Sequence, residues 1–558
     1  MTVKVGRMMG RPLSLLLAAL VAFTPFRAQA FQAPVPPPPL LVPGDEPVVV
    51  TEHELRTSNG IVAYEARAGR IPIRNDESGE VRGHIFFVAY VAKSAGSHPR
   101  PITFIWNGGP TTNSLLLHTE MFGPRRIVKD RFVDNAQSLL TVSDLVFMDP
   151  VGTGFSRPES AESEGEFLSV LGDFAATAEF IRAYRARFDA QGQPLFLAGE
   201  SYGTWRVSGV AELLAKRDIQ LDGAILISGG IPGSAMPAAF SDAMDVPART
   251  AAAFYHKKLA PDLMRDRGTT LKKAAAWAKD VYWPALRAID KLEPGQREEI
   301  ARSLARYTGV PATAINRKTL VMTNRQYLRT LIGADPAHVL DTFDMRIAGP
   351  EPEDPGYAQA ITGYLRGALG YRTDLAYTGI EDGYMPMPGP ERRSTGMRWS
   401  YNHVTITPEM LKRAQQGGGP PGSLPWLQNA MHMEPQLRVF VAAGRYDSLN
   451  MCEGNEAIVE GLDRALSRRF TTRCYEGGHM IYRDELSRIA LSNDIEDFVR
   501  HAANPKLIAN GVPTSPSAAL SSTARPAYQD EEATPHEIDP ILVQSRGTPA
   551  SPQRPRSA

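Results

Sequence analysis

The chain has 558 residues, of which 43% are hydrophobic and 22% are charged, and its formal net charge is zero. This length allows one large catalytic domain with insertions or several ordinary domains, and the composition is that of a globular protein. A chain without a basic excess lacks the electrostatic footprint for nucleic acid or for an anionic membrane surface. We therefore expect neither as a partner.

The first 30 residues predict a secretory signal peptide. Three basic residues precede a short apolar stretch at residues 15 to 23, and Ala-Gln-Ala ending at Ala30 fits a cleavage site. The alternative is an uncleaved anchor, but the apolar stretch is shorter than the roughly 20 residues that a membrane span requires. We expect a secreted or periplasmic protein without a membrane anchor. A Pro-rich linker is predicted over residues 31–48.

Strand and helix patterns alternate between residues 49 and 231, which we interpret as the first part of a catalytic core. Residues 61 to 92 alternate apolar with polar side chains, which predicts antiparallel strands at one edge of a sheet. Buried strands are predicted at 102–106, 144–148, 194–198 and 223–228, and helices at 172–188 and 204–216. This alternation predicts an α/β fold with a mostly parallel sheet and helices on both faces.

The pattern breaks over residues 232–430, which we interpret as a cap inserted into the sheet. Helix-like pieces at 251–258 and 271–292 and Pro/Gly-rich segments at 384–390 and 417–422 occur there. Residues 431–504 predict the second part of the core, with strands at 437–443 and 469–475 and a helix at 484–501. The remaining segment, 505–558, is rich in Pro, Ser, Ala and Thr and is predicted to be disordered.

The five residues from Gly199 to Gly203 read Gly-Glu-Ser-Tyr-Gly, between a predicted strand and a predicted helix. Gly-x-Ser-x-Gly at such a turn is the nucleophile elbow of α/β-hydrolases, in which a strained turn lifts the serine hydroxyl above the sheet. A residue with a Cβ at either glycine position would collide with the neighbouring strand or helix. The elbow makes Ser201 the candidate nucleophile.

A serine hydroxyl needs a histidine to accept its proton and a carboxylate to orient that histidine. In α/β-hydrolases the chain order is Ser, then Asp or Glu, then His, each at the end of a strand. Asp447 follows the strand predicted at 437–443, and His479 follows the next one. The sequence therefore predicts a catalytic triad of Ser201, Asp447 and His479.

Acyl transfer also needs two hydrogen-bond donors for the oxyanion that forms on the substrate. One is expected to be the backbone N–H of Tyr202, directly after the nucleophile. The other is expected from the Gly-rich loop Asn107-Gly108-Gly109-Pro110, which follows an earlier strand.

The chain contains two cysteines, Cys452 and Cys474. In an oxidising compartment they can form at most one disulfide, and the alternative is a pair of buried free thiols. Cys/His spacing typical of a metal site is absent from the sequence, so neither a metal nor another cofactor is expected.

Together these segments resemble the serine carboxypeptidase family. The motifs that carry the resemblance are Asn107 to Pro110, Asp149 to Ser156, Gly199 to Gly203, Asp447 with Gly454-Asn455, and Gly478-His479-Met480. They occur in the order of the family and span about residues 80 to 500. The resemblance implies an α/β-hydrolase that removes C-terminal residues from peptides, usually best at acidic pH, and a monomer or homodimer.

The resemblance also assigns roles to particular residues. Gly109 and Tyr202 would supply the oxyanion hole, and Met480 would line the leaving-group pocket. Asn107 and Glu200 would bind the terminal carboxylate of the substrate. Glu200 would have to share a proton with that carboxylate, because two close carboxylates cannot both stay ionised. Substrate affinity is then expected to fall as pH rises.

Some positions depart from the family pattern. Ile105 stands where the family has Trp, Met121 where it has Glu (here Glu120, one position earlier), and Arg445 where it has an acid. Thr111-Thr112-Asn113 replaces the common Gly-Cys-Ser, which removes a disulfide. These changes leave a secreted serine esterase or acyltransferase as the alternative, and a non-catalytic binding protein as a third.

Overall fold

The computed structural model describes residues 47–504 apart from gaps at 94–98, 234–237, 334, 336–337, 350–354, 382–397, 409 and 411–421. The predicted signal peptide, nearly all of the predicted linker and the predicted tail at 505–558 lie outside the described residues. The same holds for the Pro/Gly-rich segment at 384–390 and for most of the one at 417–422.

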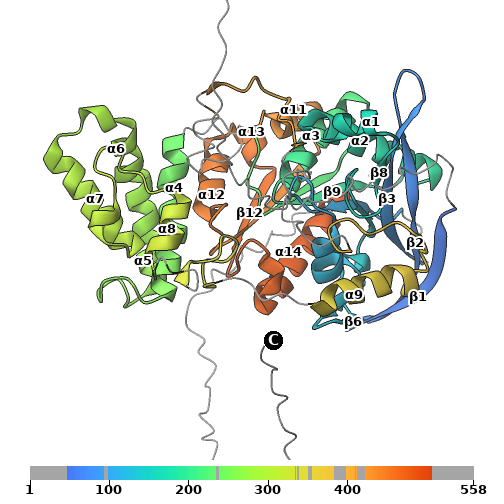
Figure 1. Ribbon diagram of the computed structural model, residues 1–558, viewed down its shortest axis with the longest axis horizontal. Helices are drawn as coiled ribbons and strands as arrows, with labels where there is room; N and C mark the ends of the chain where they lie inside the picture. The colour runs from blue at the N-terminus through green and yellow to red at the C-terminus, as the bar shows by residue number, and fades with distance from the viewer. Residues whose placement is uncertain are drawn as a thin grey trace, which may run out of the picture. The chain divides into compact units, whose positions relative to one another are not determined.

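A 10-stranded sheet is the centre of the described chain (Figure 1). Its order is β1 (Val49–Thr57), β2 (Gly60–Arg74), β3 (Val81–Ala92), β7 (Asp144–Met148), β4 (Ile102–Trp106), β9 (Leu195–Glu200), β10 (Gly223–Ile227), β11 (Arg438–Gly444) and β12 (Phe470–Tyr475), with the short β8 (Arg157–Pro158) paired to β3. The strands from β7 to β12 run parallel, and β1, β2 and β3 add an antiparallel edge. This is the α/β-hydrolase fold predicted from the sequence.

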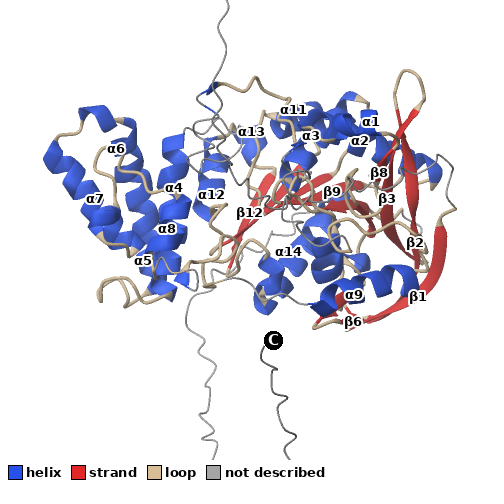
Figure 2. Cartoon of the chain, viewed as in Figure 1, coloured by secondary structure: helices blue, strands red, loops and turns tan. Residues whose placement is uncertain are grey.

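Successive side chains of a strand point to opposite faces of the sheet, and in the central strands both sets are buried in apolar clusters. In β9, Phe196 and Ala198 enter the apolar cluster that also contains Ile495 of α14 (Glu485–Ala503). Leu195 and Leu197 enter the opposite cluster, with side chains of α2 (Val170–Arg187) and α3 (Gly203–Lys216). Figure 2 shows the strands between these helices.

The α-helices that the structure describes within residues 232–430 fall into two sets. One set has an apolar cluster of its own, formed by α4 (Ala238–Tyr255), α5 (Arg267–Trp277), α6 (Trp283–Arg287), α7 (Pro294–Thr308) and α8 (Asn324–Thr330) (Figure 1). In the other set, α9 (Pro355–Gly363) and α11 (Trp426–Met433) join the two clusters of the sheet. The interpretation of the whole segment as a cap stays a prediction.

Some predicted elements differ from the structure. The helix-like piece predicted at 271–292 is largely confirmed but is shifted and irregular. α5, a π-helical turn η3 (Ala278–Tyr282) and α6 follow one another without a break from Arg267 to Arg287, and a 3-10 turn η4 (Ile289–Lys291) follows. The π-helical turn lies directly before α6, whose second residue, Pro284, has no N–H to donate to the preceding turn. The helix predicted from residue 251 begins instead at Ala238 and contains Pro247.

Four strands were not predicted. They are β1, in which Leu55 is the only fully buried residue, the two-residue β8, and the hairpin of β5 (Arg125–Val128) and β6 (Arg131–Asp134). Strands with so little buried surface carry a weak periodic signal. Within the described ranges, no helix combines the length and the apolar character needed to cross a membrane.

Candidate active site

Ser201 lies in the turn between β9 and α3, and its backbone φ angle is +57°. This left-handed conformation is strained for a residue with a Cβ, as expected at a nucleophile elbow. A Cβ on Gly199 would lie 2.2 Å from the carbonyl oxygen of Gly203, which explains the first glycine of the motif. The backbone N–H of Ser201 donates to the carbonyl oxygen of Ile227 at 2.9 Å and ties the elbow to the end of β10.

Asp447 and His479 are in direct contact. The Nδ1 atom of His479 lies 2.8 Å from Oδ2 of Asp447, and both side chains are buried. Because the carboxylate accepts this hydrogen bond, Nδ1 carries the proton and Nε2 is left as the base. Burial alone would lower the pKa of His479, but the charge and hydrogen bond of Asp447, together with Glu200, raise it overall.

The end of β10 brings the elbow and the histidine together. Ile227 accepts the hydrogen bond from the backbone of Ser201, and the next residue, Ser228, donates its hydroxyl to the carbonyl oxygen of His479 at 2.6 Å. Asn450 donates its amide to the carbonyl oxygen of Ser228 and, at 3.2 Å, to Oδ2 of Asp447. All three members of the predicted triad are therefore anchored around one strand end.

The loop after β4 packs directly on the elbow. A Cβ on Gly108 would lie 2.6 Å from the backbone nitrogen of Tyr202 and 2.9 Å from Cβ of Ser201. Only glycine allows this approach. The structure therefore brings the predicted oxyanion loop, through Gly108, against the backbone nitrogen of the predicted donor Tyr202.

Asn107 and Glu200 are hydrogen-bonded to each other beside the elbow, both buried. The amide of Asn107 donates to Oε2 of Glu200, and the hydroxyl of Tyr482 donates to the same oxygen at 3.1 Å. The other oxygen, Oε1, is buried without a hydrogen-bond partner among the described residues. Burial raises the pKa of Glu200 to about 7, against smaller lowering effects from His479 and Tyr482. This carboxyl can therefore hold a proton on Oε1 in acidic and near-neutral solution.

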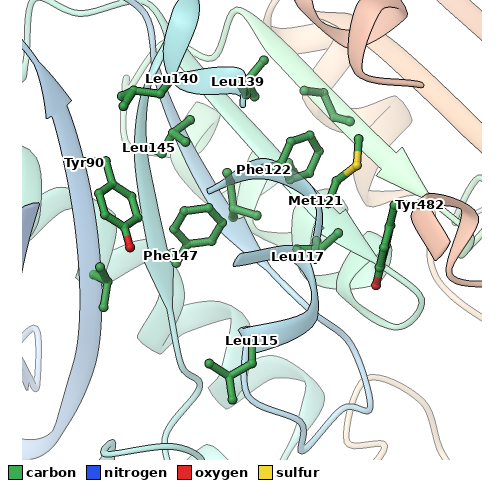
Figure 3. Close-up of a cluster of buried hydrophobic side chains, with 14 of the residues drawn as sticks. Tyr90, Leu115, Leu117, Met121, Phe122, Leu139, Leu140, Leu145, Phe147 and Tyr482 are labelled. Carbon is green, nitrogen blue, oxygen red and sulfur yellow. The ribbon is translucent and has the colours of Figure 1, made fainter. Parts of the chain in front are cut away.

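The segment after the oxyanion loop forms a π-helical turn, η1 (Leu117–Phe122). Figure 3 shows Leu117, Met121 and Phe122 among the buried apolar side chains on the sheet. Met121 is thus a core residue and not a carboxylate ligand. Glu120 forms an ion pair with Arg483 at 3.0 Å, and both influence the pKa of Glu200 through their charges.

Two further residues of the site were not identified from the sequence. Tyr482 follows His479 by three positions, so its proximity to the site could have been inferred. Phe343 comes from the inserted segment: its ring centre lies 5.2 Å from that of His479, and its carbonyl oxygen accepts the backbone N–H of His479 at 2.6 Å. Phe343 is 42% exposed, so its ring packs beside the imidazole of His479 while part of the residue stays in contact with solvent. No pattern around Phe343 indicates this contact.

The structure pairs Cys452 with Cys474 in a disulfide, with Cα atoms 5.5 Å apart. The bond joins the start of α12 (Cys452–Gly461) to β12, close in sequence to both Asp447 and His479. Met480 is partly buried against the sheet cluster that contains Tyr482. Among the described residues, no group of three or more His, Cys, Asp or Glu side chains could hold a metal ion.

The fold and this geometry define the class of protein: an α/β-hydrolase with a serine elbow and a buried Asp–His pair. Residues 62–274 match the family model described as serine carboxypeptidase. This match confirms the resemblance to the serine carboxypeptidase family over that part of the chain.

Curated relatives carry the name pheromone-processing carboxypeptidase KEX1. The protein from Lachancea thermotolerans is 29% identical over 231 residues, which cover 39% of this chain and 29% of the relative. The protein from Zygosaccharomyces rouxii is 36% identical over 121 residues, or 21% of this chain and 17% of the relative. The chain thus spans less than a third of the length of these relatives.

Solved structures are similar at lower identity. A prohormone-processing carboxypeptidase from Saccharomyces cerevisiae, KEX1(delta)p, has a TM-score of 0.47 and 15% identity, covering 78% of this chain and 91% of that one. A proline iminopeptidase from Mycobacterium smegmatis has a TM-score of 0.33 and 11% identity, covering 79% and 99%.

Proposed function

We propose that the chain is a serine-type carboxypeptidase that hydrolyses C-terminal peptide bonds through an acyl-enzyme on Ser201. The observation that carries this proposal is the Glu200 carboxyl. It is buried next to the nucleophile, is hydrogen-bonded on one oxygen by Asn107 and Tyr482, and has a second oxygen without a partner among the described residues. A neutral carboxyl in this place can donate to the terminal carboxylate of a peptide, while Asn107 helps to bind it.

In the proposed reaction, Oγ of Ser201 attacks the carbonyl carbon of the last peptide bond while Nε2 of His479 takes the hydroxyl proton. The backbone N–H groups of Gly109 and Tyr202 bind the negative oxygen. The C–N bond then breaks, and His479 gives its proton to the departing amine, which leaves beside Met480. A water molecule then gives a proton to His479 and attacks the carbonyl carbon of the ester. The bond between that carbon and Oγ of Ser201 breaks, and His479 returns the proton to Oγ.

The proposal also covers the pH dependence of the activity, the location of the protein, its substrate and its oligomeric state. Binding is favoured at acidic pH, because Glu200 loses its proton as pH rises through about 7. The predicted signal peptide and the disulfide support a secreted or periplasmic location. The substrate is the C-terminus of a peptide or protein, and the enzyme acts as a monomer or homodimer without a membrane anchor.

The alternative is a serine esterase or acyltransferase. It is favoured by Met121, a core residue at the position where the family has a carboxylate-binding Glu. An esterase would need the elbow, the Asp447–His479 pair and the oxyanion loop, but not the clamp formed by Asn107 and Glu200.

The test is release of the C-terminal residue from an N-blocked dipeptide between pH 4 and 8, with the C-terminal amide and Ser201→Ala as controls. Release that requires the free carboxylate and Ser201 supports the carboxypeptidase. No release, with Ser201 still labelled by a fluorophosphonate, supports the esterase or acyltransferase. Absence of labelling would indicate a non-catalytic protein.

A further inference from the structure

Arg206 is a fully buried arginine on α3, five positions after Ser201. Burying a guanidinium group is costly unless every part of it is paired. Its Nε atom lies 2.9 Å from Oδ2 of Asp173, which belongs to the first turn of α2. This pairing neutralises the charge and leaves the two terminal nitrogens free to bind other groups.

Those two nitrogens bind the main chain of the oxyanion loop. Nη1 donates to the carbonyl oxygen of Asn107 at 2.9 Å, and Nη2 donates to that of Pro110 at 3.1 Å. These carbonyl groups lie on either side of Gly108 and Gly109. A single rigid guanidinium therefore fixes both ends of the segment that carries the Gly109 N–H.

The same guanidinium contacts the other half of the oxyanion hole. Its carbon atom lies 5.5 Å from the ring centre of Tyr202, within the range of a cation–π contact. The hydroxyl of Tyr202 also approaches Oδ2 of Asp173 at 3.5 Å. Arg206 thus connects the loop after β4 with the residue that follows the nucleophile.

We propose that Arg206, held by Asp173, is a positioning residue that fixes the two backbone donors of the oxyanion hole relative to each other. The inference rests on the proposed acyl transfer, but not on the choice between peptide and ester. Displacing reacting groups by about 1 Å can lower a rate by about 100-fold, and losing one oxyanion donor lowers kcat by about 100- to 1,000-fold.

The chain offers a matched control away from the site. Arg249 on α4 is also buried; it donates to Asp245 at 2.7 Å and to the carbonyl oxygen of Met322 at 3.0 Å, and it lies 5.3 Å from the ring centre of Tyr327. This residue has the same kinds of partner as Arg206 in the separate helical cluster. A purely structural role would make the two arginines equivalent.

The experiment compares Arg206→Lys, Arg206→Met and Arg249→Lys in the full chain. Measurements are kcat and KM for p-nitrophenyl acetate, the rate of fluorophosphonate labelling, and the thermal unfolding midpoint. We expect Arg206→Lys to lower kcat and the labelling rate by about 10- to 100-fold, with Arg206→Met at least as impaired. The KM of the Arg206 variants should stay within about threefold of the wild-type value. Arg249→Lys should keep kcat within about twofold of the wild type, even if its unfolding midpoint falls as much as that of Arg206→Lys.

Equal kcat values for Arg206→Lys and Arg249→Lys would overturn the proposal. If the Arg206 variants do not fold, Asp173→Asn tests the proposal instead. This variant keeps Arg206 but removes the charge of the carboxylate that holds the guanidinium. We expect about three- to tenfold lower kcat at unchanged KM, and an unchanged kcat would overturn the proposal. A wild type that cleaves the ester but no peptide would refute only the carboxypeptidase assignment, because the ester and labelling comparisons would still decide the role of Arg206.

Discussion

The substitution Glu200→Gln tests the shared proton on which the proposed peptide binding depends. The Glu200 carboxyl can donate to a substrate carboxylate only while it holds its proton, and burial raises its pKa to about 7. The proton belongs on Oε1, because Oε2 already accepts from Asn107 and Tyr482. The amide nitrogen of glutamine would take the place of Oε1 and can donate at any pH.

The pKa of Glu200 gives the expected size of the change in KM with pH. With a pKa of about 7, only about a tenth of the wild-type enzyme holds the proton at pH 8, so KM should be about tenfold higher there than at pH 5. In Glu200→Gln, KM should change by less than about twofold over the same range. The assay is initial-rate kinetics with an N-blocked dipeptide, and p-nitrophenyl acetate, which has no free carboxylate, serves as the control substrate. A wild-type KM that is flat from pH 5 to 8, or a variant KM that rises as the wild type does, would refute the shared proton.

The same carboxyl should influence stability without substrate. Its pKa is raised from 4.5 to about 7 on folding, so the folded state binds a proton that the unfolded state releases. This contribution is fully present below pH 4.5 and is lost as pH rises through about 7. Between pH 4 and pH 8 the free energy of unfolding should therefore fall by about 3 kcal/mol from this group. Glu200→Gln should lack this part of the pH dependence in denaturant unfolding.

Three other substitutions have distinct expected outcomes. Tyr482→Phe removes a hydrogen bond that lowers the pKa of Glu200, so the rise of the peptide KM should move to higher pH in the same assay. Gly108→Ala places a Cβ 2.6 Å from the backbone nitrogen that follows the nucleophile, and should lower kcat on ester and peptide at least about 100-fold. Replacing Cys452 and Cys474 by Ser opens a loop with a sequence separation of 22 and should lower the free energy of unfolding by about 3 kcal/mol in urea titration.

Each of these outcomes has a result that would contradict it. A KM profile of Tyr482→Phe that moves to lower pH would show that the hydroxyl does not stabilise the carboxylate. Full ester activity in Gly108→Ala would mean that the loop can retreat from the elbow. A Cys452→Ser, Cys474→Ser variant as stable as the wild type under non-reducing conditions would indicate that the cysteines are not bonded in solution.

Much of the site could be predicted because its parts lie at strand ends that the sequence marks. Asp447 follows an apolar run, and the expected chain order leads to His479, so their contact needed no knowledge of packing. The strained φ of Ser201 was also implied by the two glycines around it. These features depend on local sequence and on the order of parallel strands.

The remaining features depend on contacts between distant segments. Phe343 lies in the segment between β10 and β11 and contacts His479. The apolar periodicity of that segment indicates which face of each helix is buried, but not which residues approach the histidine. Arg206 looked like one charged position on a helix, and its carbonyl partners are about a hundred positions away in the chain. The π-helical turn inside the helix predicted at 271–292 shows the same limit, since the apolar pattern does not distinguish it from the α-helical turns on either side.

The placement of the insertion also affects how the protein is made. β10 and β11 are parallel neighbours in the sheet, but all of the helices from α4 to α11 lie between them in the chain. At about 5–20 residues per second on the ribosome, the roughly 280 residues from Ser201 to His479 take about 15–60 s to synthesise. During that interval the nascent chain carries a nucleophile without its base. A chain truncated after β10 should therefore be inert towards neighbouring polypeptides, and the proposed hydrolase activity could arise only after His479 has been synthesised.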